Sequence, residues 1–161
     1  MPRHEGGCLC GEVRFAINAD PRRINVCHCR FCQRNTGTAY LVEPTFPADI
    51  FEITSGTPKL FQLKSGGSGK TINLYFCSTC GARLYMTFDR FPGVIGGFAG
   101  AFDDPSKLGL SSDLVRHLFT EAVQDGTVLP AGVPLFHQHA IDLDGAPTTP
   151  KVLSEPLPAK G

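Results

Sequence analysis

Short stretches in which apolar and polar residues alternate recur along the chain. In "EVRFAI", for example, Val13, Phe15 and Ile17 are separated by less apolar positions. Alternation with a period of two places every second side chain on the same face of a β-strand. The pattern therefore predicts strands in "EVRFAI", "DIFEITSG", "PKLFQLKSG", "TINLYFC" and "ARLYMTF".

Eighteen glycines and thirteen prolines separate these segments. Turn residues at intervals of about eight to twelve positions are typical of short, sequentially connected strands. We therefore predict a mainly β fold whose sheet is antiparallel and twisted. "DDPSKLG" predicts a short helical turn with Asp103 or Asp104 as its cap. "SSDLVRHLFTE" is compatible with a helix or a strand, and we favour a strand.

The length of 161 residues, 42% of them hydrophobic, predicts one compact domain with a single core. We place this domain at residues 1–141. The composition changes in "DLDGAPTTPKVLSEPLPAKG", residues 142–161, which contains four prolines and few large apolar groups. Little apolar burial is available there to offset the entropy of ordering, so we expect a proline-rich tail that is loosely held or disordered.

Fifteen Lys and Arg residues balance fifteen Asp and Glu residues. A chain without net charge has no general attraction to nucleic acid or to an anionic membrane, so neither partner is expected. The N-terminal "MPRHEGGCLCGEVRF" lacks the apolar core of a signal peptide, and no stretch approaches the roughly 18 apolar residues of a membrane span. We predict a soluble, cytoplasmic protein, in which clustered cysteines are more often metal ligands or catalytic groups than disulfides.

The seven cysteines fall into three clusters, "GGCLCGE", "CHCRFC" and "FCSTCGA". A structural zinc site usually takes four ligands as two short pairs from separate turns, and the first and third clusters supply such a set. We call it the four-cysteine site: Cys8, Cys10, Cys77 and Cys80. A zinc there would clamp two distant parts of the sheet. The alternative of two redox pairs is less favoured, because Cys-x-Cys closes a strained ring and "FCSTCG" does not precede a helical pattern.

The second cluster contributes Cys27, Cys29 and Cys32, the three-cysteine site. Three protein ligands with an open fourth position are typical of a catalytic zinc, so the sequence predicts two zinc ions per chain. Three thiolates around a divalent ion leave a net charge of about −1, which favours a soft fourth ligand such as a substrate thiolate. Two alternatives remain open. His28 would close the site, although in an extended segment it points away from Cys27 and Cys29, or the site is regulatory or vestigial and binds metal weakly.

"GGSGKT", residues 66–71, superficially suggests a nucleotide-binding loop. The required first glycine of that motif would fall at Lys64, and the segment that follows is a strand pattern rather than a helix. This segment is therefore predicted to be a hairpin loop.

Together, "GGCLCGEVRF", "CHCRFCQRNTG", "FCSTCGARL" and "GGFAGAFDDP" resemble the glutathione-dependent formaldehyde-activating enzyme family, which includes centromere protein V. The similarity runs from about Gly7 to Phe136. It implies a β-tent fold of coiled antiparallel strands with a structural zinc on the four-cysteine site and a catalytic zinc on the three-cysteine site. The family's named activity is the condensation of formaldehyde with glutathione to S-hydroxymethylglutathione, which is classed as carbon–sulfur lyase chemistry.

We therefore expect a zinc-dependent lyase that acts on a thiol, or a thiol adduct, of a small aldehyde. Arg30 and Arg34 flank the three-cysteine site and are candidates to pair with substrate carboxylates, while Gln33 and Thr36 are candidate donors to a developing oxyanion. The alternatives are a zinc-dependent dehydratase or other elimination enzyme acting on a small metabolite, and a non-catalytic zinc-binding module like centromere protein V. Exposed strand edges leave a homodimer open.

Overall fold

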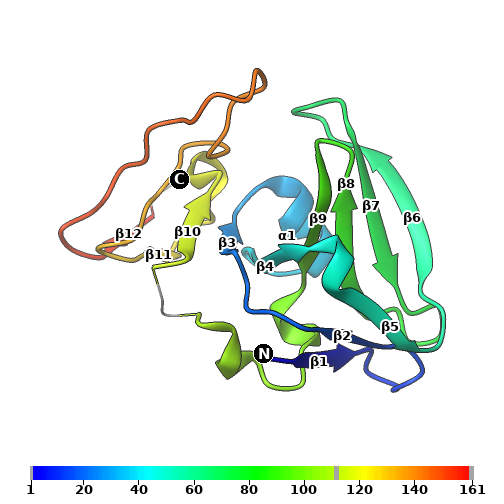
Figure 1. Ribbon diagram of the computed structural model, residues 1–161. Helices are drawn as coiled ribbons and strands as arrows, with labels where there is room; N and C mark the ends of the chain where they lie inside the picture. Colours follow the sequence, from blue (N-terminus) through cyan, green and yellow to red (C-terminus); the bar gives the residue numbers. More distant parts are fainter. Residues whose placement is uncertain (1, 111–112, 160–161) are drawn as a thin grey trace. The chain divides into compact units, whose positions relative to one another are not determined.

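The computed structural model describes residues 2–110 and 113–159. The chain forms two compact units whose segments alternate along the sequence (Figure 1). Unit 1 comprises Met1–Arg23 and Glu43–Leu110, and unit 2 comprises Ile24–Val42 and Ser111–Gly161. Each unit holds one of the two cysteine sites, with the four-cysteine site in unit 1 and the three-cysteine site in unit 2.

The first sheet of unit 1 has three antiparallel strands in the order β1, β2, β5. They are β1 (His4–Gly7), β2 (Arg14–Ile17) and β5 (Phe51–Ser55). Phe15 is buried; its ring stacks on Phe51 with centroids 5.5 Å apart and forms an edge-to-face pair with Phe102 with centroids 5.2 Å apart. Such aromatic pairs add to the stabilisation that burial supplies. The turn between β1 and β2 carries the first pair of cysteines.

A second antiparallel sheet in unit 1 runs in the order β4, β9, β8, β7, β6. Its strands are β4 (Leu41–Pro47), β6 (Lys59–Lys64), β7 (Thr71–Phe76), β8 (Arg83–Phe88) and β9 (Phe91–Gly97). Leu74, Leu84, Met86 and Ile95 are buried on this sheet. Residues 65–70 join β6 to β7, which confirms the predicted hairpin loop. The turn between β7 and β8 carries the second pair of cysteines.

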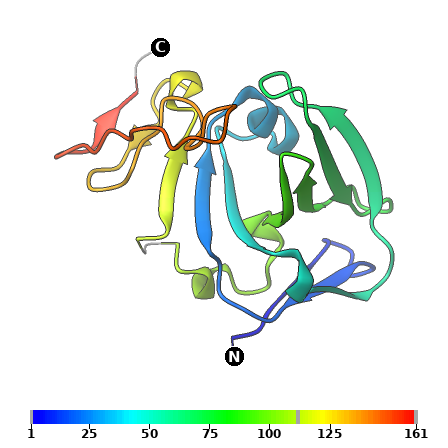
Figure 2. The ribbon, with the colours of Figure 1, turned by 45° about the horizontal axis from the view of Figure 1, so that its top comes forward.

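Unit 2 is built on two parallel strands, β3 (Arg23–Cys27) and β10 (Val115–Leu118), which lie side by side (Figure 2). A short helix, α1 (Arg30–Thr36), follows β3 after two residues. The parallel pair departs from the expected antiparallel pairing. Parallel neighbours need a long connection, and the nearly ninety residues between these strands provide one. The alternation pattern predicts strands but carries no information about which strand pairs with which.

The described structure also contains short 3₁₀ turns: η1 (Ala48–Ile50), η2 (Ala99–Ala101), η3 (Pro105–Leu108) and η4 (Thr120–Ala122).

Strands β2, β5, β6, β7 and β8 form where the alternation predicts them, so the mainly β prediction is confirmed. "DDPSKLG" forms η3 after Asp104, whose side chain makes no capping bond. In "SSDLVRHLFTE", the favoured strand is confirmed over Val115–Leu118, while residues 111–112 lie outside the described residues.

The C-terminal segment is paired along much of its length. Leu135 and Lys151 exchange two backbone hydrogen bonds of 2.8 Å, and the N–H of Thr148 donates to the carbonyl of Ala140 at 3.0 Å. Strand β11 (Val128–Leu129) pairs with β12 (Leu157–Pro158). The expectation of a loosely held tail is therefore wrong for residues 142–159, because backbone hydrogen bonds hold a segment that has few apolar side chains. A domain boundary after residue 141 stays a prediction.

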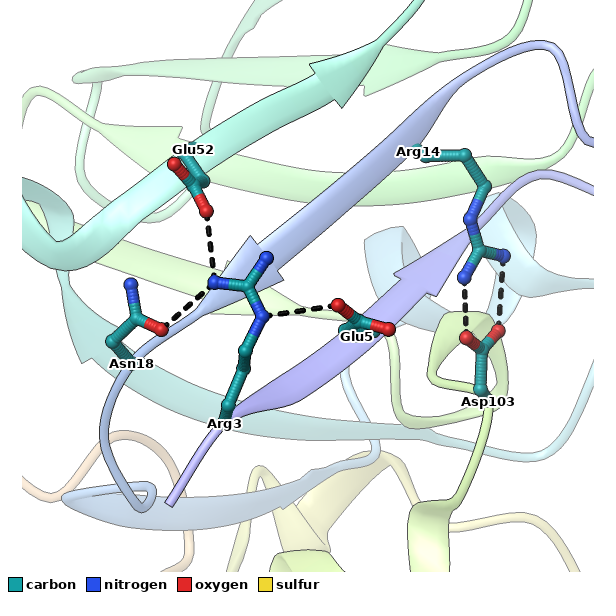
Figure 3. A network of polar contacts seen from close by, with 6 residues as sticks. All are labelled: Arg3, Glu5, Arg14, Asn18, Glu52 and Asp103. Atoms are coloured by element: carbon teal, nitrogen blue, oxygen red, sulfur yellow. Dashed lines mark hydrogen bonds and ion pairs between the residues drawn. The ribbon is translucent and has the colours of Figure 1, made fainter. Parts of the chain in front are cut away.

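Charged side chains cross-link the strands of the β1–β2–β5 sheet on its exposed side (Figure 3). The Nε of Arg3 donates to Glu5 at 3.0 Å, and its Nη1 donates to Asn18 at 3.0 Å and to Glu52 at 2.9 Å. All three ionic side chains are about half exposed. Exposed pairs of this kind are worth about 0–1 kcal/mol each, so this network aligns the strands more than it stabilises them.

A double-mutant cycle on Arg14 and Asp103 is expected to measure a coupling energy of about 0.5–1 kcal/mol at pH 7. Arg14 donates to both carboxylate oxygens of Asp103 (Figure 3), and these bonds lower the pKa of Asp103. A carboxyl whose pKa falls on folding contributes stability that is present above about pH 4 and lost as the pH falls through the folded-state value. Urea unfolding of Arg14→Met, Asp103→Asn and the double variant measures the coupling, which should shrink in 1 M salt.

The matched control is a second cycle that combines Arg14→Met with Asp49→Asn. Asp49 is exposed in unit 1 and takes part in none of the ion pairs found among the described residues. This control should show no coupling. An equal coupling in both cycles would contradict the assignment.

Candidate functional site

The four sulfurs of the four-cysteine site converge from two turns of unit 1. All four Sγ atoms lie within 4.8 Å of one another. The Sγ atoms of Cys8 and Cys10 are 3.5 Å apart, and those of Cys10 and Cys77 are 3.7 Å apart. A disulfide needs about 2.05 Å, whereas a tetrahedron with metal–sulfur bonds of about 2.3 Å has sulfurs about 3.8 Å apart. The spacing therefore fits a tetrahedral metal and does not fit a disulfide.

The backbone of each turn folds around its first cysteine. The N–H of Gly11 donates to the carbonyl of Cys8 at 3.1 Å, and the N–H of Gly81 donates to that of Cys77 at 2.9 Å. Both glycines have a positive φ, 79° and 74°, which residues with a Cβ adopt only under strain. The N–H of Val13 then points at the Cys8 sulfur at 3.2 Å. Such N–H groups stabilise thiolates and hold metal ligands in place.

A similar effect acts on Cys80. The backbone N–H groups of Ala82 and Cys10 lower the pKa of its thiol to about 6. The Thr79 hydroxyl donates to the Glu12 carboxylate and so links the two turns beside the sulfurs. Cys8 and Cys77 are buried, while Cys10 is exposed. The site is thus anchored in the core of unit 1 and open on one side, as suits a structural metal near the surface.

The sulfurs of the three-cysteine site are brought together by a strand that runs into a helix. Cys27 ends β3, Cys29 is the N-cap of α1, and Cys32 lies in the first turn of α1. Their Sγ atoms lie within 4.8 Å of one another. The N–H of Cys32 donates to the sulfur of Cys29 at 3.4 Å, which is the usual bond of an N-cap side chain. The helix is what turns Cys29 and Cys32 toward Cys27, and the sequence pattern did not predict it.

The three sulfurs differ in charge and exposure. Cys27 and Cys32 are buried and Cys29 is half-buried. Hydrogen bonds from the thiols of Cys27 and Cys32, together with backbone N–H groups, lower the pKa of Cys29 to about 3. The bonds within the cluster and burial raise the pKa values of Cys27 and Cys32 well above the usual range. The most accessible of the three sulfurs is therefore the one whose pKa favours the thiolate.

Among the described residues, no histidine or carboxylate joins this group of three sulfurs. Soft thiolate ligands suit zinc, and three of them leave one position of a tetrahedron for another ligand. The donor set therefore fits a zinc ion with an open position. The two sets of sulfurs lie in different units, which agrees with the division into two sites that the sequence predicts.

The polar residues of α1 take different places. Gln33 is buried; its amide donates to the carbonyls of His28 at 2.6 Å and of Ala122 at 2.8 Å, and its oxygen accepts from Gln124 at 2.9 Å and from Arg30. Both amide hydrogens are thus bonded to backbone. The structure therefore places Gln33 as a link between α1 and two backbone segments.

Two further candidates lie nearer the surface of the helix. The Thr36 hydroxyl donates to the carbonyl of Cys32 at 2.8 Å. Arg34 is exposed in the last turn of α1. The substrate contacts expected of these residues stay predictions.

Two buried histidines next to the three sulfurs were not predicted. The Nε2 of His28 lies 3.0 Å from the Nδ1 of His117, and the ring centroids are 5.2 Å apart. The rings of His28 and Tyr40 form an edge-to-face pair with centroids 5.3 Å apart. Burial lowers the pKa of His28, and burial together with His28 lowers that of His117 to about 4, so both rings are neutral near pH 7. In a strand His117 lies on the same face as the apolar Val115, and this weak signal was the only sequence indication that His117 faces the interior.

No helix among the described residues has the length and apolar character needed to cross a membrane.

The family model of the glutathione-dependent formaldehyde-activating enzyme matches residues 3–122. A Halomonas elongata protein provisionally named as such an enzyme is 29% identical over 102 residues, which cover 62% of this chain and 65% of the relative. A Penicillium rubens protein with the same provisional name is 23% identical over 83 residues, covering 52% of this chain and 42% of the relative. The chain therefore matches less than two thirds of the length of these relatives.

The fold is similar to that in a crystal structure of a Rhodobacter sphaeroides protein, with a TM-score of 0.50 and 23% identity. The similarity covers 65% of this chain and 94% of the other. At this identity the comparison establishes the fold alone.

Proposed function

The chain belongs to the glutathione-dependent formaldehyde-activating enzyme family, and from this premise we propose that it is a zinc-dependent carbon–sulfur lyase. Its substrates would be a glutathione-like thiol and a small aldehyde, or the adduct of the two. The observation that carries the proposal is the cluster of three sulfurs within 4.8 Å of one another that no histidine or carboxylate of the described chain completes. Three soft thiolate ligands leave one position on a zinc ion, and the sulfur of a substrate is suited to fill it as the fourth ligand.

In the proposed reaction, the substrate sulfur adds to the carbonyl carbon of the aldehyde. A carbon–sulfur bond forms, the π electrons move to the oxygen, and that oxygen takes a proton to give a hydroxyl. The reverse step breaks the same bond and releases thiol and aldehyde. Zinc bound to Cys27, Cys29 and Cys32 would supply a positive charge that keeps the substrate sulfur deprotonated near neutral pH.

The residues of α1 would serve the binding of this substrate. We propose that Arg34, which is exposed on the helix, pairs with a carboxylate of the thiol substrate. Gln33 and Thr36 donate to backbone carbonyls, so we propose that they hold α1 in place and keep Cys32 oriented. None of the seven cysteines is in a disulfide, and we propose a reducing, cytoplasmic location on this basis.

Protection from alkylation tests the proposal. The zinc-loaded protein is treated with iodoacetamide, and labelling of Cys27, Cys29 and Cys32 is followed by peptide mass spectrometry. Saturating glutathione should slow this labelling, whereas S-methylglutathione, which lacks the thiol, should not. Condensation is followed in parallel by NMR with ¹³C-formaldehyde and glutathione, and the protein should accelerate it.

Equal labelling with and without glutathione would contradict thiol binding. Activity on sulfur-free substrates that is lost in Cys29→Ser would instead support the dehydratase. Salt-sensitive DNA binding near physiological ionic strength would support the non-catalytic module.

A further inference from the structure

His28 connects the three-cysteine site to strand β10 and to helix α1. It lies between Cys27 and Cys29, and its side chain is fully buried. Its backbone N–H donates to the carbonyl of Leu118 in β10 at 3.0 Å, and its carbonyl accepts from the Gln33 amide of α1 at 2.6 Å. Its Nε2 meets His117 of β10. The corner that carries the sulfurs is therefore fastened to β10 through both the backbone and the side chain.

The hydrogen bond between the two imidazoles has one favoured direction. Each neutral ring carries one N–H, and the contact of 3.0 Å can hold one hydrogen. Within the described structure, the Nδ1 of His28 is buried without a hydrogen-bond partner. If His117 were the donor, the proton of His28 would have to sit on that Nδ1, and buried N–H groups without acceptors are rarer than unused acceptors. His28 is therefore the donor, through Nε2, and His117 is the acceptor, through Nδ1.

His117 is itself firmly held. In β10 it lies opposite Val26 of β3. Its N–H donates to the carbonyl of Pro134 at 2.9 Å, and its own carbonyl accepts from the N–H of Phe136 at 2.9 Å. These two bonds tie the backbone of His117 to residues 134–136 and so hold the residue that presents the acceptor nitrogen.

We propose that His117 is a positioning residue of the three-cysteine site, which holds His28, and with it the sulfurs of Cys27 and Cys29, in the arrangement that binds metal. The inference rests on the metal binding assumed in the proposed function. Partners that orient metal ligands typically contribute about 10- to 100-fold to metal affinity. Here the partner acts on the backbone between two ligands rather than on a ligand atom.

Cobalt titration of three proteins tests the proposal, because Co²⁺ bound to thiolates absorbs visible light. His117→Leu removes the acceptor, and His117→Asn keeps an acceptor oxygen near the position of Nδ1. The four-cysteine site serves as the reference within the same molecule. His117→Leu should weaken Co²⁺ binding at the three-cysteine site by about 10- to 100-fold relative to the reference site, and His117→Asn should restore most of the affinity.

Equal losses at both sites, or an unchanged three-cysteine site, would overturn the proposal, because a merely structural histidine has no selective effect. Two cobalt ions in the wild type without a selective loss in His117→Leu contradict this inference alone. A wild type that binds a single cobalt ion contradicts the proposed function as well.

A measurement on the wild-type protein covers the case in which His117→Leu does not fold. Long-range ¹H–¹⁵N NMR reports which nitrogen of each histidine ring carries the proton. We expect the proton on Nε2 of His28 and an unprotonated Nδ1 on His117. A proton on Nδ1 of His28 would overturn the proposed direction of the hydrogen bond and with it the role of His117 as acceptor.

Discussion

Cys77→Ser is expected to abolish cooperative folding of unit 1. Cys77 is 0% exposed, and its sulfur lies 3.7 Å from that of Cys10 in a turn 67 residues away. A structural zinc in zinc-finger peptides contributes about 10–16 kcal/mol, which is comparable with the roughly 5–15 kcal/mol that stabilises a whole domain. Loss of one ligand would also leave the remaining thiolates close together without a cation between them. The two turns would then lose the link that holds their strands in place.

Circular dichroism during thermal unfolding, with the zinc content measured on the same sample, checks this prediction. Leu9→Ser is the matched control, because Leu9 lies between Cys8 and Cys10 but is 90% exposed. The control should keep the wild-type unfolding midpoint and zinc content. A Cys77→Ser protein with a wild-type midpoint would show that the four-cysteine site does not stabilise the fold.

Cys29→Ser is expected to lower kcat/KM for the condensation by at least about 100-fold while the protein stays folded. The reason is that loss of metal-ion catalysis costs several kcal/mol of transition-state stabilisation. Cys29 is the half-buried member of the three sulfurs, and the hydrogen bonds that it accepts make its pKa the lowest of the three. Cys29 is also the N-cap of α1, and serine is among the preferred N-cap residues, so the helix should persist. The substitution therefore removes a metal ligand without removing the helix that presents the others.

Steady-state rates with formaldehyde and glutathione, compared with the unfolding midpoint of the same samples, measure this effect. Leu9→Ser again provides the control and should retain wild-type activity. Wild-type rates in Cys29→Ser, with one zinc lost, would mean that the reaction does not use the three-cysteine site.

The division of the cysteines into two sites could be predicted because metal-ligand pairs are local patterns. Cys8 with Cys10, and Cys77 with Cys80, are each separated by one or two residues within a turn. Glycines that follow these turns adopt the positive φ that the turns require. The strands around them could be predicted for the same reason, since alternation is a property of adjacent positions.

The helix that carries Cys29 and Cys32 could not be predicted in this way. With seven residues, α1 is too short to show a helical period, and its N-cap is a cysteine rather than a typical capping residue. Its position depends on Gln33, whose bonds reach Ala122 and Gln124. Those contacts span about ninety residues and leave no trace in a local pattern.

The histidine pair was missed for a related reason. His28 and His117 are 89 positions apart and meet because β3 and β10 pair in parallel. The C-terminal segment shows the same limit: its order comes from backbone pairing, such as that between Leu135 and Lys151, which composition does not encode. Local patterns thus identified the two clusters of sulfurs, whereas long-range pairing determined how the three-cysteine site is supported.

The number of zinc ions per chain tests the central claim most directly. Elemental mass spectrometry on untagged protein purified without chelator should give two zinc ions per wild-type chain and one in folded Cys29→Ser. One zinc ion per wild-type chain, with Cys27, Cys29 and Cys32 freely reactive toward a thiol reagent, would contradict the account.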